Sequence, residues 1–206
     1  MCHQIHALML VCANTIMKNN TSYRNIEQAL NDSFASLLLH TLPESISVMS
    51  LVRMSGINRT TFYNHYPDGM PQFLATQEES FAQRVLHILR QMALQKDLSE
   101  INEYKDLVQY VLSVPVEQLR LLSKCEFVIA SLDYTEECLV NECRRNRKEE
   151  TPEEFSLLSV EIRALWGSAV ELIYQLVLQY CDASESSAIR GKISAIALSI
   201  SKHIFP

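Results

Sequence analysis

The chain has 206 residues, of which 48% are hydrophobic and 20% charged, and its formal net charge is −6. This balance is typical of a folded globular protein and excludes a disordered chain. The six cysteines form no Cys-x-x-Cys pair and have no zinc-site spacing, so we expect reduced thiols that fill space in a cytoplasmic protein. Only four glycines and six prolines interrupt the chain, which favours long helices over many short strands.

The N-terminal segment predicts neither an export signal nor a membrane anchor. The apolar stretch 8–13 lacks a basic start and a clear cleavage site, and no run reaches the roughly 18 apolar residues of a membrane span. We expect residues 1–21 to be an extension of doubtful structure. Its first 16 residues are either loose or an artefact of start-codon choice.

Apolar spacing predicts three short helices in the next part of the chain, over residues 26–39, 48–54 and about 59–66. Ser47 and Asn58 are plausible N-caps of the second and third helix. Gly56 lies between these two helices, where a sharp turn requires a left-handed backbone. The segment 67–71 contains two prolines and a glycine, and we expect it to end the third helix.

Longer helices are predicted from residue 72 onward, over residues 72–95, 99–113, 116–131, 134–148, 155–181 and 186–204. The charged stretch 143–150 is typical of a solvated helix end and loop. Thr151 and Pro152 have the composition of a helix start. The helix over 155–181 is apolar on nearly all sides, which indicates burial on more than one side. We therefore expect a homodimer through about 155–204; the alternative is a monomeric core closed by the same helices.

The segment 47–66 carries the strongest functional signal. Val48, Leu51 and Val52 would share one helix face, which Ile57 and Phe62 can meet from the turn and the next helix. This packing leaves four hydrogen-bonding side chains directed outward, as a reader of the DNA major groove needs: Arg59, Thr60, Tyr63 and Asn64. Between residues 45 and 66 there are two arginines and no acidic residue, although the whole chain is acidic.

This stretch resembles the DNA-binding domain of the TetR family of transcriptional repressors. The resemblance rests on Ser-Gly-Ile-Asn at 55–58 and on Thr61, Phe62, Tyr63, His65 and Tyr66. It covers about residues 22–75, while the rest of the chain is similar only in its helical style. It implies that double-stranded DNA is contacted by Ser47, Asn58, Arg59, Thr60, Thr61, Tyr63, Asn64 and His65, with Phe62 and Tyr66 in the core.

Two departures from the family pattern motivate an alternative. Family members usually carry a lysine just after the recognition helix, where this chain has none, and Val52 replaces a common alanine. The alternative is a helical interaction protein whose degenerate helix-turn-helix no longer reads DNA. A third hypothesis, a small helical enzyme or carrier, has no motif to support it.

The resemblance also implies a small-molecule effector in the helical body, of unknown identity. Candidate aromatic residues for its cavity are Tyr104, Tyr110, Phe127, Tyr134, Trp166 and Tyr174. For each of them, ordinary core packing is the competing interpretation. The histidines have no partners at metal-ligand spacing, so we expect neither a metal site nor a cofactor.

The sequence therefore predicts an all-α protein in three parts: the extension 1–21, a helix-turn-helix DNA-binding domain over 22–71, and a regulatory and dimerisation domain over 72–206. The predicted function is a ligand-responsive, homodimeric repressor without enzymatic activity.

Overall fold

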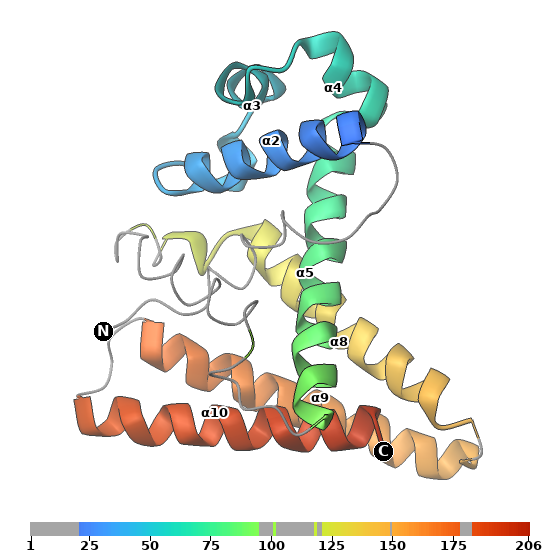
Figure 1. The fold of residues 1–206 in the computed structure, drawn as a ribbon. Helices are drawn as coiled ribbons and strands as arrows, with labels where there is room; N and C mark the ends of the chain where they lie inside the picture. The colour runs from blue at the N-terminus through green and yellow to red at the C-terminus, as the bar shows by residue number, and fades with distance from the viewer. Residues whose placement is uncertain (1–20, 95–100, 102–117, 119–120, 149, 178–182) are drawn as a thin grey trace.

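The computed structural model describes residues 21–94, 101, 118, 121–148, 150–177 and 183–206. Within these ranges all regular structure is helical, as predicted. The elements in chain order are α2 (Thr21–Leu38), η2 (Pro43–Ser45), α3 (Val48–Ser55), α4 (Arg59–His65), α5 (Met70–Ala93), α8 (Glu126–Asn146), α9 (Pro152–Val177) and α10 (Ala183–Ile204). In Figure 1, α2 to α4 lie at one end of the molecule and α9 and α10 at the other.

Aromatic rings hold α2, α4 and the start of α5 together. Phe34, Phe62 and Phe73 are at most 1% exposed, and Tyr66 is 4% exposed. The ring of Phe73 meets those of Phe34 and Tyr66 edge-on, each at a centroid distance of 5.2 Å. Such edge-to-face pairs contribute stability beyond the area they bury. This cluster fixes α4 against the rest of the molecule.

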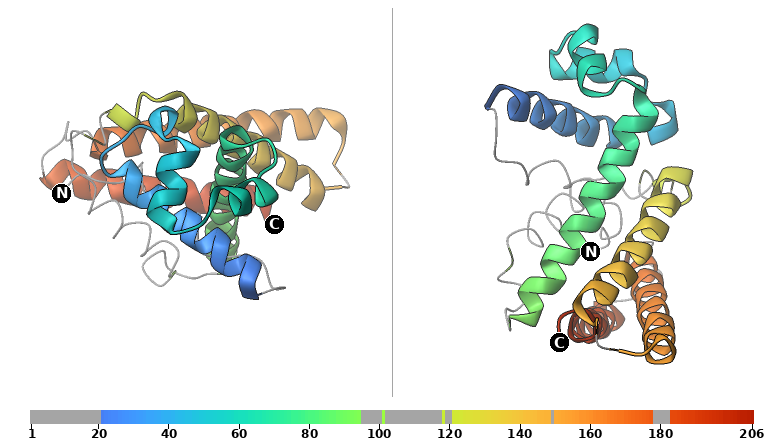
Figure 2. Two further views of the ribbon diagram at one scale, coloured as in Figure 1. Left: turned by 90° about the horizontal axis from the view of Figure 1, so that it is seen from above. Right: turned by 90° about the vertical axis from the view of Figure 1, so that its right-hand side faces the viewer.

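Helix α5 connects the two ends of the molecule. Its 24 residues give a length of about 36 Å at 1.5 Å per residue. Figure 2 shows it running from α4 down to the level of α9 and α10, with α8 alongside. Near its start, Gln77 donates a 2.9 Å hydrogen bond to Asn31 of α2. The predicted domain boundary after residue 71 falls in the first turn of this continuous helix.

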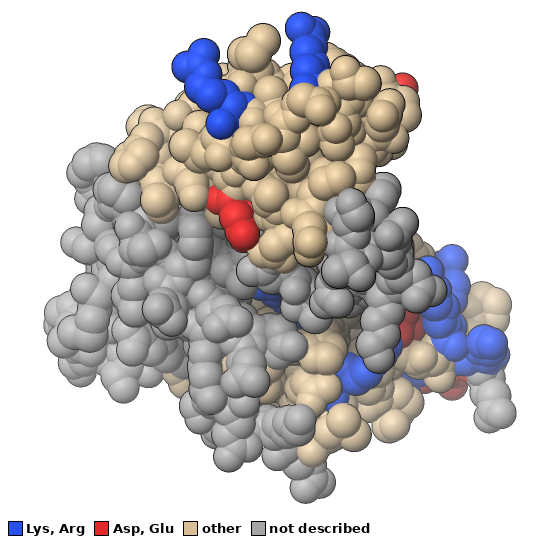
Figure 3. All heavy atoms as spheres, turned by 45° about the horizontal axis from the view of Figure 1, so that its top comes forward, with Lys and Arg blue, Asp and Glu red and all other residues tan. Residues whose placement is uncertain are grey.

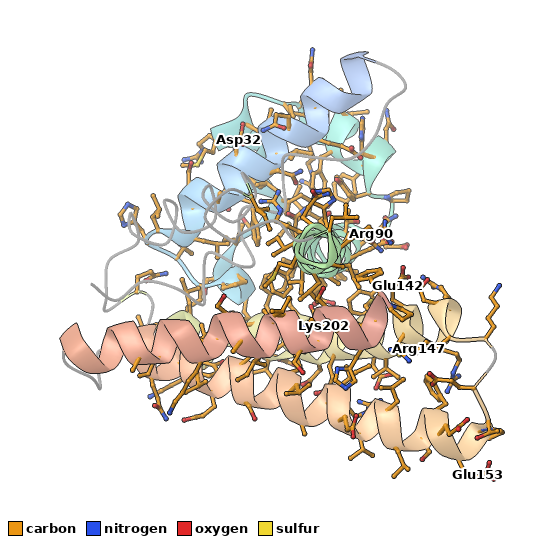
Figure 4. The ribbon with its side chains drawn as sticks, turned by 60° about the horizontal axis from the view of Figure 1, so that its bottom comes forward. Asp32, Arg90, Glu142, Arg147, Glu153 and Lys202 are labelled. Carbon is orange, nitrogen blue, oxygen red and sulfur yellow. The ribbon has the colours of Figure 1, made fainter. Side chains whose placement is uncertain are left out.

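The C-terminal end of α5 is fixed to α8 and α10. Arg90 forms a 3.0 Å ion pair with Glu142 of α8, and its guanidinium lies 5.1 Å from the ring centroid of Phe205. The Ser201 hydroxyl donates to the Leu89 carbonyl at 2.8 Å. Figure 4 shows Arg90 and Glu142 close together where these helices meet.

The prediction of separate helices over 116–131 and 134–148 is wrong. One helix, α8, runs through the expected break without interruption. The hydroxyls of Ser131 and Thr135 donate to the carbonyls of Phe127 and Ser131, four residues back, at 2.7 Å each. These polar side chains are thereby satisfied while buried inside the helix, so they do not end it. The helix predicted over 99–113 lies outside the described residues, except Ile101.

Other predicted helix ends are close to the observed ones. Helix α9 begins at Pro152, where Thr151 and Glu154 form a reciprocal pair of capping hydrogen bonds. The Thr151 N–H and the Thr151 hydroxyl each donate to the Glu154 carboxylate at 2.9 Å, and these two hydrogen bonds lower the pKa of that carboxyl. Helix α2 begins five residues before the predicted start at residue 26.

Hydrogen bonds from two residues, Phe127 and Gln118, help to join the helical body to the α2–α4 end. The Glu44 carboxylate accepts a 3.3 Å hydrogen bond from the Phe127 N–H at the start of α8. The Gln118 amide donates to the carbonyls of Leu38 and Thr41. The body therefore contacts the chain segment between α2 and α3 directly.

Candidate nucleic-acid interface

Helix α3 begins with the predicted cap. The Ser47 hydroxyl accepts from the Ser50 N–H at 3.1 Å, and the Ser50 hydroxyl accepts from the Ser47 N–H at 3.0 Å. Two N–H groups at the helix start are thus satisfied. The inner face of α3 buries Leu51 at 0% and Val52 at 6% exposure. Val52 is therefore accommodated in the core although it is larger than alanine.

Gly56 makes the turn between α3 and α4. Its φ of 69° lies in the left-handed region, as predicted. Asn58 then caps α4 with its side-chain oxygen, which accepts from the Thr61 N–H at 2.7 Å. A seven-residue helix has few internal hydrogen bonds, so this cap matters for its formation.

The inner face of α4 is locked in the core. Phe62 is 0% exposed and packs against the rings of Tyr63 and Tyr66, with centroid distances of 5.5 and 5.3 Å. Phe62 and Tyr66 are thus core residues, as the sequence predicts. Their burial fixes which side of α4 faces solvent.

The outer face of α4 presents Arg59, Thr60 and Asn64, all of which are exposed. The sequence predicts that Tyr63 also points outward, but it is half-buried because its ring packs on Phe62 and on the core. The Arg59 guanidinium lies 5.4 Å from the Tyr63 ring centroid, with 3.5 Å between its Nη2 and the Tyr63 hydroxyl. This contact orients the arginine on the helix surface.

The remaining predicted contact residues are less accessible or already engaged. Thr61 and His65 are half-buried. Ser47 and Asn58 are exposed, but their side chains already hold the helix caps. The structure thus brings all eight predicted residues to one pair of short helices and gives them different roles.

Arg53 is an additional exposed cation that was not among the predicted contact residues. It lies in the last turn of α3, on the side opposite the buried Leu51. Its spacing of two residues from the buried Leu51, about 200° around a helix, is the sequence signal that could have found it. Figure 3 shows two separate groups of Lys or Arg atoms at the top of this end of the molecule, with few Asp or Glu atoms nearby.

The aromatic residues suggested for an effector cavity have other partners. Phe127 packs edge-on against Phe34 at 6.0 Å. The Trp166 indole N–H donates to the Leu132 carbonyl at 3.2 Å. The Tyr174 hydroxyl donates to the Ser123 carbonyl at 3.2 Å, and burial raises the pKa of this phenol. These contacts are those of core residues.

Tyr134 is 41% exposed, which places it at the surface of α8. Tyr104 and Tyr110 lie outside the described residues.

Other kinds of site are not indicated by the described residues. They contain no group of three or more His, Cys, Asp or Glu side chains arranged to hold a metal ion. Cys125, Cys138 and Cys143 are free thiols, and burial raises the pKa of Cys125 to about 12. In the same ranges, no helix has the length and apolar character that crossing a bilayer requires.

Comparison of the chain with protein-family models, with curated proteins and with solved structures finds no match.

Proposed function

We propose that this protein is a transcriptional regulator of the TetR type, which binds double-stranded DNA through a helix-turn-helix formed by α3 and α4. One observation carries the proposal. Helix α4 is fixed by the buried Phe62 and presents Arg59, Thr60 and Asn64 to solvent, in a segment that contains no acidic residue.

The chemistry of this face suits the DNA major groove. An arginine fork pairs with guanine, an asparagine amide with adenine, and a threonine offers a hydroxyl and a methyl group. The exposed Arg53 in the last turn of α3 is available for phosphates. Tyr63 would contribute its hydroxyl, which lies beside Arg59 at the edge of the face.

Dimerisation through α9 and α10 would complete this function. Leu157 and Val160 of α9 are 69% and 62% exposed in the single chain, and Leu198 of α10 is 38% exposed. The exposed stripe on α10 continues through Ala188, Gly191 and Ala195, at helical spacing. Because α9 and α10 pack along each other, two copies could bury both stripes in a four-helix interface.

In such a dimer, two copies of α4 would enter successive major grooves about 34 Å apart on a near-palindromic site. A small-molecule effector in the helical body would change that spacing through α5. Couplings of this kind are typically about 1–3 kcal/mol. The protein would then act as a ligand-responsive repressor.

The DNA-binding part is tested by fluorescence anisotropy, with labelled duplexes that tile the DNA upstream of the gene. We expect the double variant T60A/N64A to bind at least about tenfold more weakly than the wild type, at the 1–3 kcal/mol of a lost base contact. The control is N141A, which removes an exposed amide from α8. Equal affinity of all three proteins, or no binding to any duplex at low salt, would refute the proposal.

The dimer is tested separately by size-exclusion chromatography with light scattering. We expect a dimer for the wild type and a monomer for L157E/V160E, because two carboxylates would be placed in an apolar interface. The control is I129E, which adds a carboxylate at a 49% exposed position on α8. A monomeric wild-type protein would contradict this part of the proposal.

The second candidate is the interaction protein that no longer reads DNA. The exposure of Met49 and Met54 on α3, at 53% and 50%, favours it, because methionine-rich surfaces suit protein partners. Retention of a protein partner that is lost in M49Q/M54Q, together with no DNA binding, would select this function.

A further inference from the structure

An open pocket of about 610 Å³ lies where α8 ends and α9 begins, far from α3 and α4. Its lining includes the cations Arg144, Arg147 and Lys148 and one carboxylate, that of Glu150. Three positive charges against one negative charge make the lining cationic in a chain whose net charge is −6. This volume is typical of sites for small ligands.

One of the three cations is part of the fold. Arg147 donates to the carbonyls of His203 and Lys202 at 2.6 and 3.1 Å, and forms a 2.7 Å ion pair with Glu150. It therefore satisfies carbonyl groups at the C-terminal end of α10 and neutralises the pocket's carboxylate. Figure 4 shows Arg147 directed toward the end of α10.

The other two cations, Arg144 and Lys148, are exposed. No described residue supplies either of them with a carboxylate partner. Neighbouring Arg145 differs, because it forms a 3.1 Å ion pair with Glu142. As far as the described residues go, the pocket thus retains two positive charges whose hydrogen-bond donors can serve a ligand.

Arg144 is held in position for such a ligand. Its guanidinium lies 4.4 Å from the ring centroid of Phe155, the aromatic residue in the pocket wall. Stacking leaves the edge of the planar guanidinium free, and that edge donates to phosphate oxygens in a two-point geometry. Ser156 adds a hydroxyl to the same wall. A guanidinium fork, an ammonium and a hydroxyl together match a phosphate group better than a neutral ligand.

We propose that this pocket binds a small phosphate-bearing anion, with Arg144 and Lys148 contacting the phosphate and Arg147 forming a fixed wall. The site involves neither α4 nor DNA, so it does not depend on the proposed DNA binding.

The test is isothermal titration calorimetry of the full chain with inorganic pyrophosphate, at low salt and neutral pH. We expect saturable binding to the wild type with a Kd below about 1 mM, and at least tenfold weaker binding to R144Q/K148Q. The control is K124Q/K192Q, which removes the same two charges from exposed lysines elsewhere. Circular dichroism would verify that both variants are folded.

Specific weakening in R144Q/K148Q supports the site, because the control lowers the net charge by the same amount. Equal affinity for the wild type and R144Q/K148Q would overturn the proposal. So would an equal loss in both double variants, which would indicate attraction by overall charge, or no saturable binding by the wild type.

Discussion

Two substitutions at Asn58 separate the stability of α4 from its proposed contact with DNA. In N58A, the Thr61 N–H loses the acceptor that lies 2.7 Å away. Loss of an N-cap of this kind costs about 1 kcal/mol of unfolding free energy. This cost should lower the stability of α2 to α5 together, because Phe62 of α4 is buried in the aromatic core that these helices share.

In N58D, the cap acceptor is retained and a negative charge is added at the N-terminus of α4. The helix dipole favours this charge by about 0.3–1 kcal/mol, so we expect stability equal to or above that of the wild type. A phosphate about 8 Å away would repel the same charge by roughly 2 kcal/mol at an effective dielectric constant of about 20. The Kd for DNA should therefore rise about thirtyfold at low salt.

Urea unfolding followed by circular dichroism measures the first effect, and fluorescence anisotropy with labelled duplex measures the second. The control is N64A, which removes an exposed amide on the same helix that caps nothing, and should change stability by less than about 0.5 kcal/mol. Unchanged stability of N58A would disprove the capping role. Tight DNA binding by N58D would show that this end of α4 does not face phosphates.

Three further predictions concern the turn, the thiols and the core. G56A should lose about 1–2 kcal/mol of unfolding free energy in urea, because alanine is disfavoured at the left-handed φ of 69°. The added Cβ would meet no atom within 4 Å, so neither a clash nor a new contact would change this cost, and an unchanged urea midpoint would contradict the prediction. Cys125, with a pKa of about 12, should react with iodoacetamide at pH 8 roughly a thousandfold more slowly in the folded protein than in guanidinium, by mass spectrometry of timed samples; equal rates would refute its burial. W166F should lower the free energy of unfolding by about 1–3 kcal/mol and therefore the Tm, because the Leu132 carbonyl loses its hydrogen-bond donor inside the core. An unaltered Tm would argue against that hydrogen bond.

The parts of the fold that the sequence predicted correctly are those determined by neighbouring residues. Ser47 and Asn58 cap helices by bonding three residues ahead, and Gly56 turns the chain through its own φ. The spacing of Leu51 and Phe62 also determines which faces of α3 and α4 are buried. All of these residues lie within 20 positions of one another, so their spacing in the sequence is enough to predict their roles.

The features that sequence analysis missed depend on distant residues. Whether Ser131 ends a helix or lies buried within it depends on its hydrogen bond and on the helices around α8. The charged stretch at the end of α8 was expected to be solvated, and Arg144 and Lys148 are exposed. Arg147, however, bonds to a carbonyl 56 residues later in the chain, which only the tertiary structure reveals.

The distribution of charge sets a quantitative limit on how this protein would bind DNA. The segment 45–66 holds two of the 18 basic residues and none of the 24 acidic ones, so the rest of the chain carries a formal charge of 16 − 24, or −8. Such a body repels DNA and leaves α3 and α4 as the favoured side of approach.

Arg53 and Arg59 are the only two cations of segment 45–66, so a dimer would neutralise at most four phosphates through this segment. The plot of the logarithm of the DNA association constant against the logarithm of salt concentration should then have a slope no steeper than about −3.6. Anisotropy titrations at salt concentrations between about 50 and 200 mM would measure this slope. R53Q/R59Q should bring the slope close to zero. A wild-type slope of about −8 would mean that cations outside α3 and α4 also reach phosphates, and the interface would have to be extended beyond these two helices.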